Sequence, residues 1–127
     1  MSDTHTAVAD LVSEPVLDRA ALAVARADAG EALFAELVGM FDAEQARRVV
    51  MLRAALAADD RTGIVFQAHV LRSAGSQLAA TRLAAIAAQL EREAKVAGPM
   101  RLHRLVGEVI DLAASSFAAL RESVRGG

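Results

Sequence analysis

The chain has 127 residues, a formal net charge of −2 and no cysteine. This length corresponds to one domain, and the small net charge gives no electrostatic basis for binding nucleic acid. The absence of cysteine excludes disulfides, thiolate zinc sites and a thiol nucleophile. Hydrophobic residues make up 54% of the sequence but aromatic residues only 3%. Alanine and leucine supply most of the apolar content, and this composition favours helices over strands.

The first 13 residues are predicted to form a flexible tail. They lack the basic start and the long apolar run of a signal peptide, and no stretch of the chain is apolar for long enough to cross a bilayer. We therefore expect a cytoplasmic protein that does not use a membrane. Its folded region is expected over residues 14–124, with a short C-terminal tail over residues 125–127.

Helical spacing of the apolar residues predicts five helices in the folded region. They are expected over residues 16–27, 31–57, 61–79, 81–97 and 100–123. Ser13 is the expected cap of the first helix, and Gly30 follows the end of that helix. Asp59-Asp60 separates the second helix from the third, and Gly98-Pro99 ends the fourth, because proline cannot continue a helix.

Each of the four longer segments carries an apolar stripe. The stripe expected on the 31–57 helix comprises Leu33, Leu37, Met40, Phe41, Val49, Leu52 and Leu56. Four amphipathic helices joined by short connections predict an all-α protein, an antiparallel four-helix bundle. The short additional N-terminal helix is expected to cap the bundle.

The helix over residues 61–79 contains His69, and its side chain is expected to face away from the core. The apolar stripe of this helix comprises Ile64, Ala68, Leu71, Gly75 and Leu78. At about 100° per residue, these five positions fall within roughly 80° of the helix circumference, and His69 lies roughly 135° from their centre. This geometry argues against a core histidine.

A metal site at His69 is also not expected. The other histidines are His5 in the tail and His103 on the last helix. No His-x-x-x-His pair occurs, and no Glu-x-x-His pair shares a helix face with a partner. Two interpretations of His69 remain open from the residues alone: an ordinary solvated side chain, or a side chain exposed for chemistry.

The segment from Ala68 to Glu91, AHVLRSAGSQLAATRLAAIAAQLE, carries a recognisable motif. The matching positions are Ala68-His69-x-Leu71, Arg72 at a usual lysine, Leu78-x-Ala80, Leu83 and Leu90-Glu91. This pattern resembles the signature of histidine-containing phosphotransfer (HPt) domains of phosphorelays. The order of the predicted helices fits as well, so the resemblance covers about residues 14–124.

The motif departs from the family pattern at two positions. Ser73 replaces a glycine four residues after His69, and Ala79 replaces the glycine that follows Leu78. Ser73 lies one turn from the imidazole on the same surface, where its hydroxymethyl group either crowds a phosphoryl group or donates a hydrogen bond to it. The sequence leaves both possibilities open.

The resemblance implies a phosphocarrier that exchanges a phosphoryl group with the aspartate of response-regulator receiver domains. His69 would be the phosphoacceptor through Nε2, since a neutral imidazole is a good nucleophile near pH 7. Arg72 would stabilise the phosphoryl oxygens, and Glu91 would orient the ring of His69. For Arg72 and Glu91, ordinary solvated side chains are the alternative.

The resemblance also implies a surface for the partner around His69. Ser73 and Ser76 are candidate phosphate contacts, and Val65 and Phe66 are candidate partner contacts. Val70 belongs either to this surface or to the core.

The sequence contains no glycine-rich phosphate loop, so we expect neither ATP binding nor autokinase activity. No cofactor is expected on this chain, because the receiver would bring the Mg²⁺ ion. Receiver domains are the expected partners, and a hybrid sensor histidine kinase is a further candidate. Two alternative functions remain: an HPt-like adaptor that binds and inhibits a receiver or kinase without accepting phosphate, and a structural or oligomerising bundle.

Overall fold

The computed structural model describes residues 16–126, and within this range every regular element is a helix. The helices are α2 (Arg19–Ala29), α3 (Glu31–Ala57), α4 (Arg61–Gln77), α5 (Thr81–Glu93) and α6 (Pro99–Gly126). The predicted tail over residues 1–13, with its Ser13 cap, lies outside the described residues. Residues 125 and 126 were predicted to be tail, but they continue α6.

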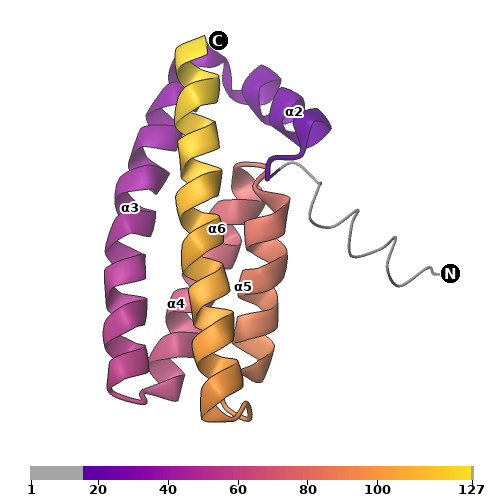
Figure 1. Ribbon diagram of the computed structural model, residues 1–127. Helices are drawn as coiled ribbons and strands as arrows, with labels where there is room; N and C mark the ends of the chain where they lie inside the picture. Colours follow the sequence, from indigo (N-terminus) through magenta and orange to yellow (C-terminus); the bar gives the residue numbers. More distant parts are fainter. Residues whose placement is uncertain (1–15, 127) are drawn as a thin grey trace, which may run out of the picture.

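Helices α3 to α6 form an antiparallel bundle in which each helix packs against two of the others. Helix α4 lies between α3 and α5, and α6 closes the ring by packing against the same two helices. Helix α2 packs on α3 and lies across the end of the bundle at which α6 finishes (Figure 1). The predicted four-helix bundle with an additional N-terminal helix is therefore confirmed. Within the described residues, no helix is long and apolar enough to span a membrane.

The first described helix begins at Arg19 and not at Val16, as the sequence predicted. The side chain of Asp18 caps it by accepting a hydrogen bond from the backbone N–H of Ala21 at 3.0 Å, and a carboxylate is a strong helix cap. The backbone N–H of Asp18 also donates to the carbonyl of Ala79 at 2.8 Å. This contact ties the start of α2 to the turn between α4 and α5.

Helix α4 ends at Gln77 in a left-handed turn. Ala79 has φ +62°, and the N–H of Ala80 donates to the carbonyl of Gly75 at 2.8 Å. This is the hydrogen bond of a Schellman motif, whose left-handed residue is usually glycine. Ala79 is also the position where the family motif has glycine, so the backbone conformation explains that preference.

The next helix is shorter than the sequence predicted, because α5 ends at Glu93 and residues 94–96 form a turn. The guanidinium of Arg61, at the start of α4, donates hydrogen bonds to the carbonyls of Ala94 and Ala97. Carbonyls at a helix end lack intrahelical partners. Arg61 therefore supplies a partner that the local sequence does not show.

The core is built mainly from the stripes predicted on α4, α5 and α6. Every member of the α4 stripe is buried. The prediction for α3 was partly wrong, since Leu33 and Met40 are 48% and 67% exposed. The buried residues of α3 are Phe34, Val38, Leu52 and Ala55. Helical spacing alone does not distinguish two neighbouring apolar faces of a long helix, and packing against α4 and α6 selects one of them.

Helices α4 and α5 approach each other closely at Gly75. A Cβ atom at this position would lie 3.0 Å from the carbonyl oxygen of Ala80 and 3.0 Å from the backbone nitrogen of Ala84. The missing side chain therefore allows the two backbones to pack together. This contact sets the distance between the helix that carries His69 and the helix that carries Glu91.

Candidate functional site

His69 lies on the outer surface of α4, as the helical geometry predicts. Its side chain is 52% exposed, whereas Ala68 and Leu71 on the same helix are fully buried. The buried stripe fixes the rotation of α4, and the rotation in turn directs the imidazole outward. The protein thus presents an exposed ring on a well-anchored helix.

Glu91 and Arg72 both contact this ring. Oε2 of Glu91, on α5, lies 3.1 Å from Nδ1 of His69. Arg72, one turn beyond His69 on α4, donates from Nε to Oε1 of Glu91 at 2.8 Å. One terminal nitrogen of the same guanidinium, Nη2, lies 3.0 Å from Nδ1. The three side chains therefore form a closed triangle in which each contacts the other two.

The two contacts at Nδ1 need different protonation states of that nitrogen. Glu91 can only accept a hydrogen bond, so this contact needs a proton on Nδ1, whereas Arg72 can only donate and needs a bare Nδ1. In both cases the contacts occupy one side of the ring. Nε2, on the other side, is the nitrogen left for a partner molecule.

Glu91 is ionised at neutral pH. Partial burial of the carboxylate raises the pKa of Glu91, but hydrogen bonds from Arg72 and His69 outweigh this effect, and the pKa lies below its ordinary value. The carboxylate is 25% exposed and Arg72 is 39% exposed. The site therefore places one fixed negative charge beside Nδ1 and one positive charge within reach of solvent.

A shallow hollow between α4 and α5 adjoins the triangle. It is lined by Val65, Arg72, Ala88, Glu91 and Arg92. The hollow thus brings Val65, a predicted partner contact, beside Arg72 and Glu91. Arg92 was not predicted from the sequence, because no pattern on its own helix distinguishes it from other solvated arginines.

The other predicted surface residues lie along α4. Phe66 is 54% exposed, and Ser76 is also exposed, whereas Ser73 and Val70 are partly buried. A surface of one aromatic and several small side chains therefore surrounds the imidazole along the helix.

Phe66 rests against Arg48 of α3, with the guanidinium carbon 5.6 Å from the centre of the phenyl ring. This distance is within the range of a cation–π interaction. Arg48 was not predicted from the sequence, because pairing it with Phe66 requires the register between α3 and α4.

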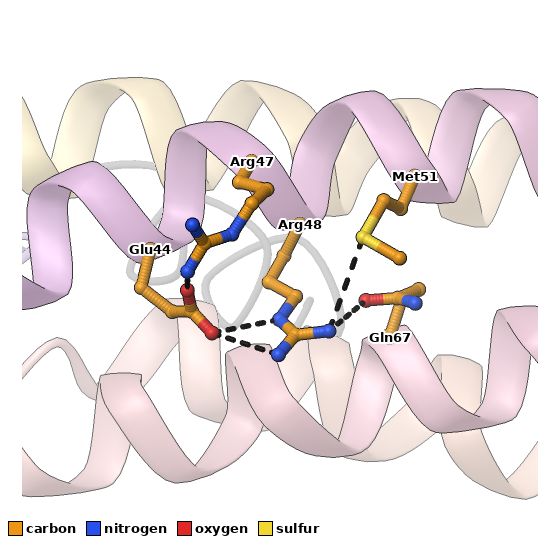
Figure 2. A network of polar contacts seen from close by, with 5 residues as sticks. All are labelled: Glu44, Arg47, Arg48, Met51 and Gln67. Atoms are coloured by element: carbon orange, nitrogen blue, oxygen red, sulfur yellow. Dashed lines mark hydrogen bonds and ion pairs between the residues drawn. The ribbon is translucent and has the colours of Figure 1, made fainter.

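Arg48 is itself fixed by its neighbours (Figure 2). Glu44 accepts from its Nε at 2.9 Å and also pairs with Arg47. Nη1 of Arg48 donates to Oε1 of Gln67 on α4 at 3.4 Å, and the side chain of Gln67 is almost fully buried. The Glu44–Arg48 spacing of four residues is typical of a helical ion pair. The contact with Gln67 joins two helices, so spacing along α3 does not indicate it.

No group of three or more histidine, aspartate and glutamate side chains within residues 16–126 is placed to hold a metal ion. His103, the other described histidine, lies on α6. Its Nδ1 is 2.9 Å from the carbonyl oxygen of Pro99. A carbonyl can only accept, so Nδ1 of His103 carries a proton.

Comparison with known proteins gives two matches. The family model described as Hpt domain matches residues 36–122, well over half of the chain. The crystal structure of histidine-containing phosphotransfer protein B (HptB) from Pseudomonas aeruginosa PAO1 has a similar fold, with a TM-score of 0.80 and 24% sequence identity. The similarity covers 91% of this chain and 99% of that one. No curated protein matches the chain.

Proposed function

Since this chain belongs to the family of Hpt domains, we propose that His69 accepts a phosphoryl group from a receiver aspartate and donates it to another. The family match confirms the resemblance seen in the motif, and it assigns the protein to histidine phosphotransfer in two-component phosphorelays. The observation that supports His69 as the acceptor is its exposed ring, whose Nδ1 lies within hydrogen-bond distance of Glu91 and of Arg72. This arrangement leaves Nε2 available.

The proposed step is an in-line displacement at phosphorus. The lone pair of Nε2 attacks the phosphorus of the receiver's aspartyl phosphate, the bond from phosphorus to the aspartyl oxygen breaks, and the aspartate leaves as a carboxylate. Nδ1 keeps its proton throughout. The ring gains positive charge, which the carboxylate of Glu91 offsets. The reverse step returns the phosphoryl group to a second receiver.

Arg72 is the proposed contact for the phosphoryl oxygens. Its side chain is 39% exposed, and a guanidinium binds phosphate with strong, charge-assisted hydrogen bonds. The rotation that would bring it from Glu91 to the phosphoryl group involves only its own side chain. Ser73 and Ser76 are proposed as weaker contacts on the same side of α4.

The proposed partner surface extends from His69 to Phe66 and Val65. A standard interface buries about 800 Å² on each partner, so a receiver centred on Nε2 also covers residues one helical turn away. Phe66 is preorganised for such a contact by Arg48. We propose that receiver domains bind this surface. The receiver domain of a hybrid sensor histidine kinase is one candidate.

The protein is proposed to act as a phosphocarrier without autokinase activity, in the cytoplasm. The magnesium ion that transfer needs would be bound by the receiver. This chain would supply the nucleophile, the orienting carboxylate and the guanidinium.

The experiment is transfer of radiolabelled phosphate from phosphorylated receiver domains to the purified chain. Wild type should take up acid-labile, base-stable label, and His69→Gln should take up none while keeping the helical circular dichroism of the wild type. His103→Gln is the matched control, since it removes an exposed histidine elsewhere and should label normally. Label that persists in His69→Gln would overturn the assignment. Receiver binding without any label on wild type would instead support the inhibitory adaptor.

A further inference from the structure

The contacts at Nδ1 of His69 exclude each other in a neutral ring. Oε2 of Glu91 at 3.1 Å requires Nδ1–H, while Nη2 of Arg72 at 3.0 Å requires the lone pair of Nδ1. A neutral imidazole carries one proton, so a bare Nδ1 means that Nε2 is protonated. Whether Nδ1 pairs with Glu91 or with Arg72 therefore decides whether Nε2 can act as a nucleophile.

We propose that Arg72 is a positioning residue that controls which nitrogen of His69 carries the proton. While its guanidinium donates to Nδ1, the ring is held as the Nε2–H tautomer, which has no lone pair at Nε2. When the guanidinium turns away, solvent takes the proton from Nε2 and supplies one to Nδ1, since the ring is exposed. Nδ1–H then pairs with Glu91, and Nε2 has a free lone pair. The proton count of the ring is the same in both states.

The event that turns Arg72 away is the arrival of the phosphoryl group itself. Phosphoryl oxygens are stronger acceptors for a guanidinium than a neutral ring nitrogen. Glu91 remains the acceptor for Nδ1–H, because the ring contacts Oε2 whereas Arg72 contacts Oε1, so the contact with the ring does not need Arg72. This consequence for transfer rests on the proposed function: the nucleophile would be released only when a phosphodonor is bound.

Neutral tautomers can be measured in the unphosphorylated protein by ¹⁵N NMR of the imidazole rings, at a pH about two units above the ordinary histidine pKa of about 6.5. Arg72→Met should raise the ratio of Nδ1–H to Nε2–H in His69 roughly tenfold, as expected for loss of one hydrogen bond. Glu91→Ala should shift the same ratio in the opposite direction. Opposite shifts from two adjacent substitutions are not expected from a general loosening of the site.

Two controls accompany this measurement. Arg92→Met removes a positive charge from the same hollow and should leave the tautomer ratio unchanged, since net charge alone acts on both neutral tautomers. His103 serves as an internal standard, because its Nδ1 faces the carbonyl of Pro99 and should remain Nδ1–H in every variant.

An unchanged ratio in Arg72→Met, or shifts of the same sign in Arg72→Met and Glu91→Ala, would overturn the proposal. Because no receiver is present, these outcomes are independent of whether His69 takes up phosphate. Failure of the labelling experiment with the expected tautomer shifts would refute the proposed function alone. Normal labelling without tautomer shifts would refute only the control by Arg72.

Discussion

Oε2 of Glu91 lies 3.1 Å from Nδ1 of His69, although the two residues are 22 positions apart and belong to different helices. The close packing of α4 on α5 creates this relationship, and the carboxylate gives the ring a partner on the side away from a receiver. The proposed roles of both residues depend on it.

Glu91→Ala should slow phosphoryl transfer about 10- to 100-fold, the range expected for loss of a hydrogen bond to a charged group. Glu91→Gln keeps an acceptor for Nδ1–H and should slow phosphoryl transfer less than Glu91→Ala does. Single-turnover rates with a phosphorylated receiver measure the effect, and circular dichroism checks that the bundle is intact. Equal rates for wild type and Glu91→Ala would leave the orienting role without support.

Gly75→Ala should lower the free energy of unfolding by about 1–3 kcal/mol, because overpacking a tight contact costs this much. The added Cβ would meet backbone atoms of Ala80 and Ala84 that cannot rotate away. Gly39→Ala is the matched control, since a Cβ there meets nothing within 4 Å. Because Gly39 lies in a helix interior, this control should raise the free energy of unfolding by up to about 1 kcal/mol. Urea unfolding that gives both variants the same stability would contradict the close approach of α4 and α5.

Ala79→Gly should raise the free energy of unfolding by about 0.5–1 kcal/mol. A left-handed conformation costs an L-residue roughly 1–2 kcal/mol, and Ala79 adopts φ +62°. Loss of its buried methyl group offsets part of the gain. Ala58→Gly, at a helix end with φ −89°, provides the comparison, and its free energy of unfolding should not rise. A loss of stability in Ala79→Gly would contradict the strained turn.

Stability should fall at acidic pH through Glu93. Hydrogen bonds from Arg101 on α6 and from Gln89 lower the pKa of Glu93 to about 2. Because the folded-state pKa is lowered, its contribution is complete above the ordinary value of about 4.3 and is lost as the pH falls toward 2.

The comparison of wild type with Glu93→Gln isolates this contribution from that of the other carboxylates. The variant should be less stable at pH 6, and the difference should shrink by pH 3 in urea unfolding. If the difference in stability between wild type and variant is the same at pH 6 and pH 3, the charge of Glu93 is not involved.

The sequence predicts the parts of this structure that depend on local periodicity. The α4 stripe fixes the outward direction of His69, and the 31–57 helix has the expected bounds. The Ala68–Glu91 motif indicates the family and names all three members of the triangle. Capping by Asp18 was missed because Ser13, the predicted cap, is also of a residue type that favours the start of a helix.

The remaining features depend on contacts between helices, which spacing along one helix does not determine. Arg72 was expected to face a phosphoryl group, and its contact with Glu91 depends on the distance between α4 and α5. The support of Phe66 by Arg48 depends on the register of α3 against α4. The exposure of Leu33 and Met40 depends on which face of α3 the bundle covers.

The most direct test of the central claim is NMR detection of the phosphorus–nitrogen bond in ¹⁵N-labelled protein after transfer from a phosphorylated receiver. We predict that phosphorus couples to Nε2 of His69, and that the ring keeps a proton on Nδ1. Phosphorus attached to Nδ1 of His69, to His103 or to any carboxylate would contradict the account.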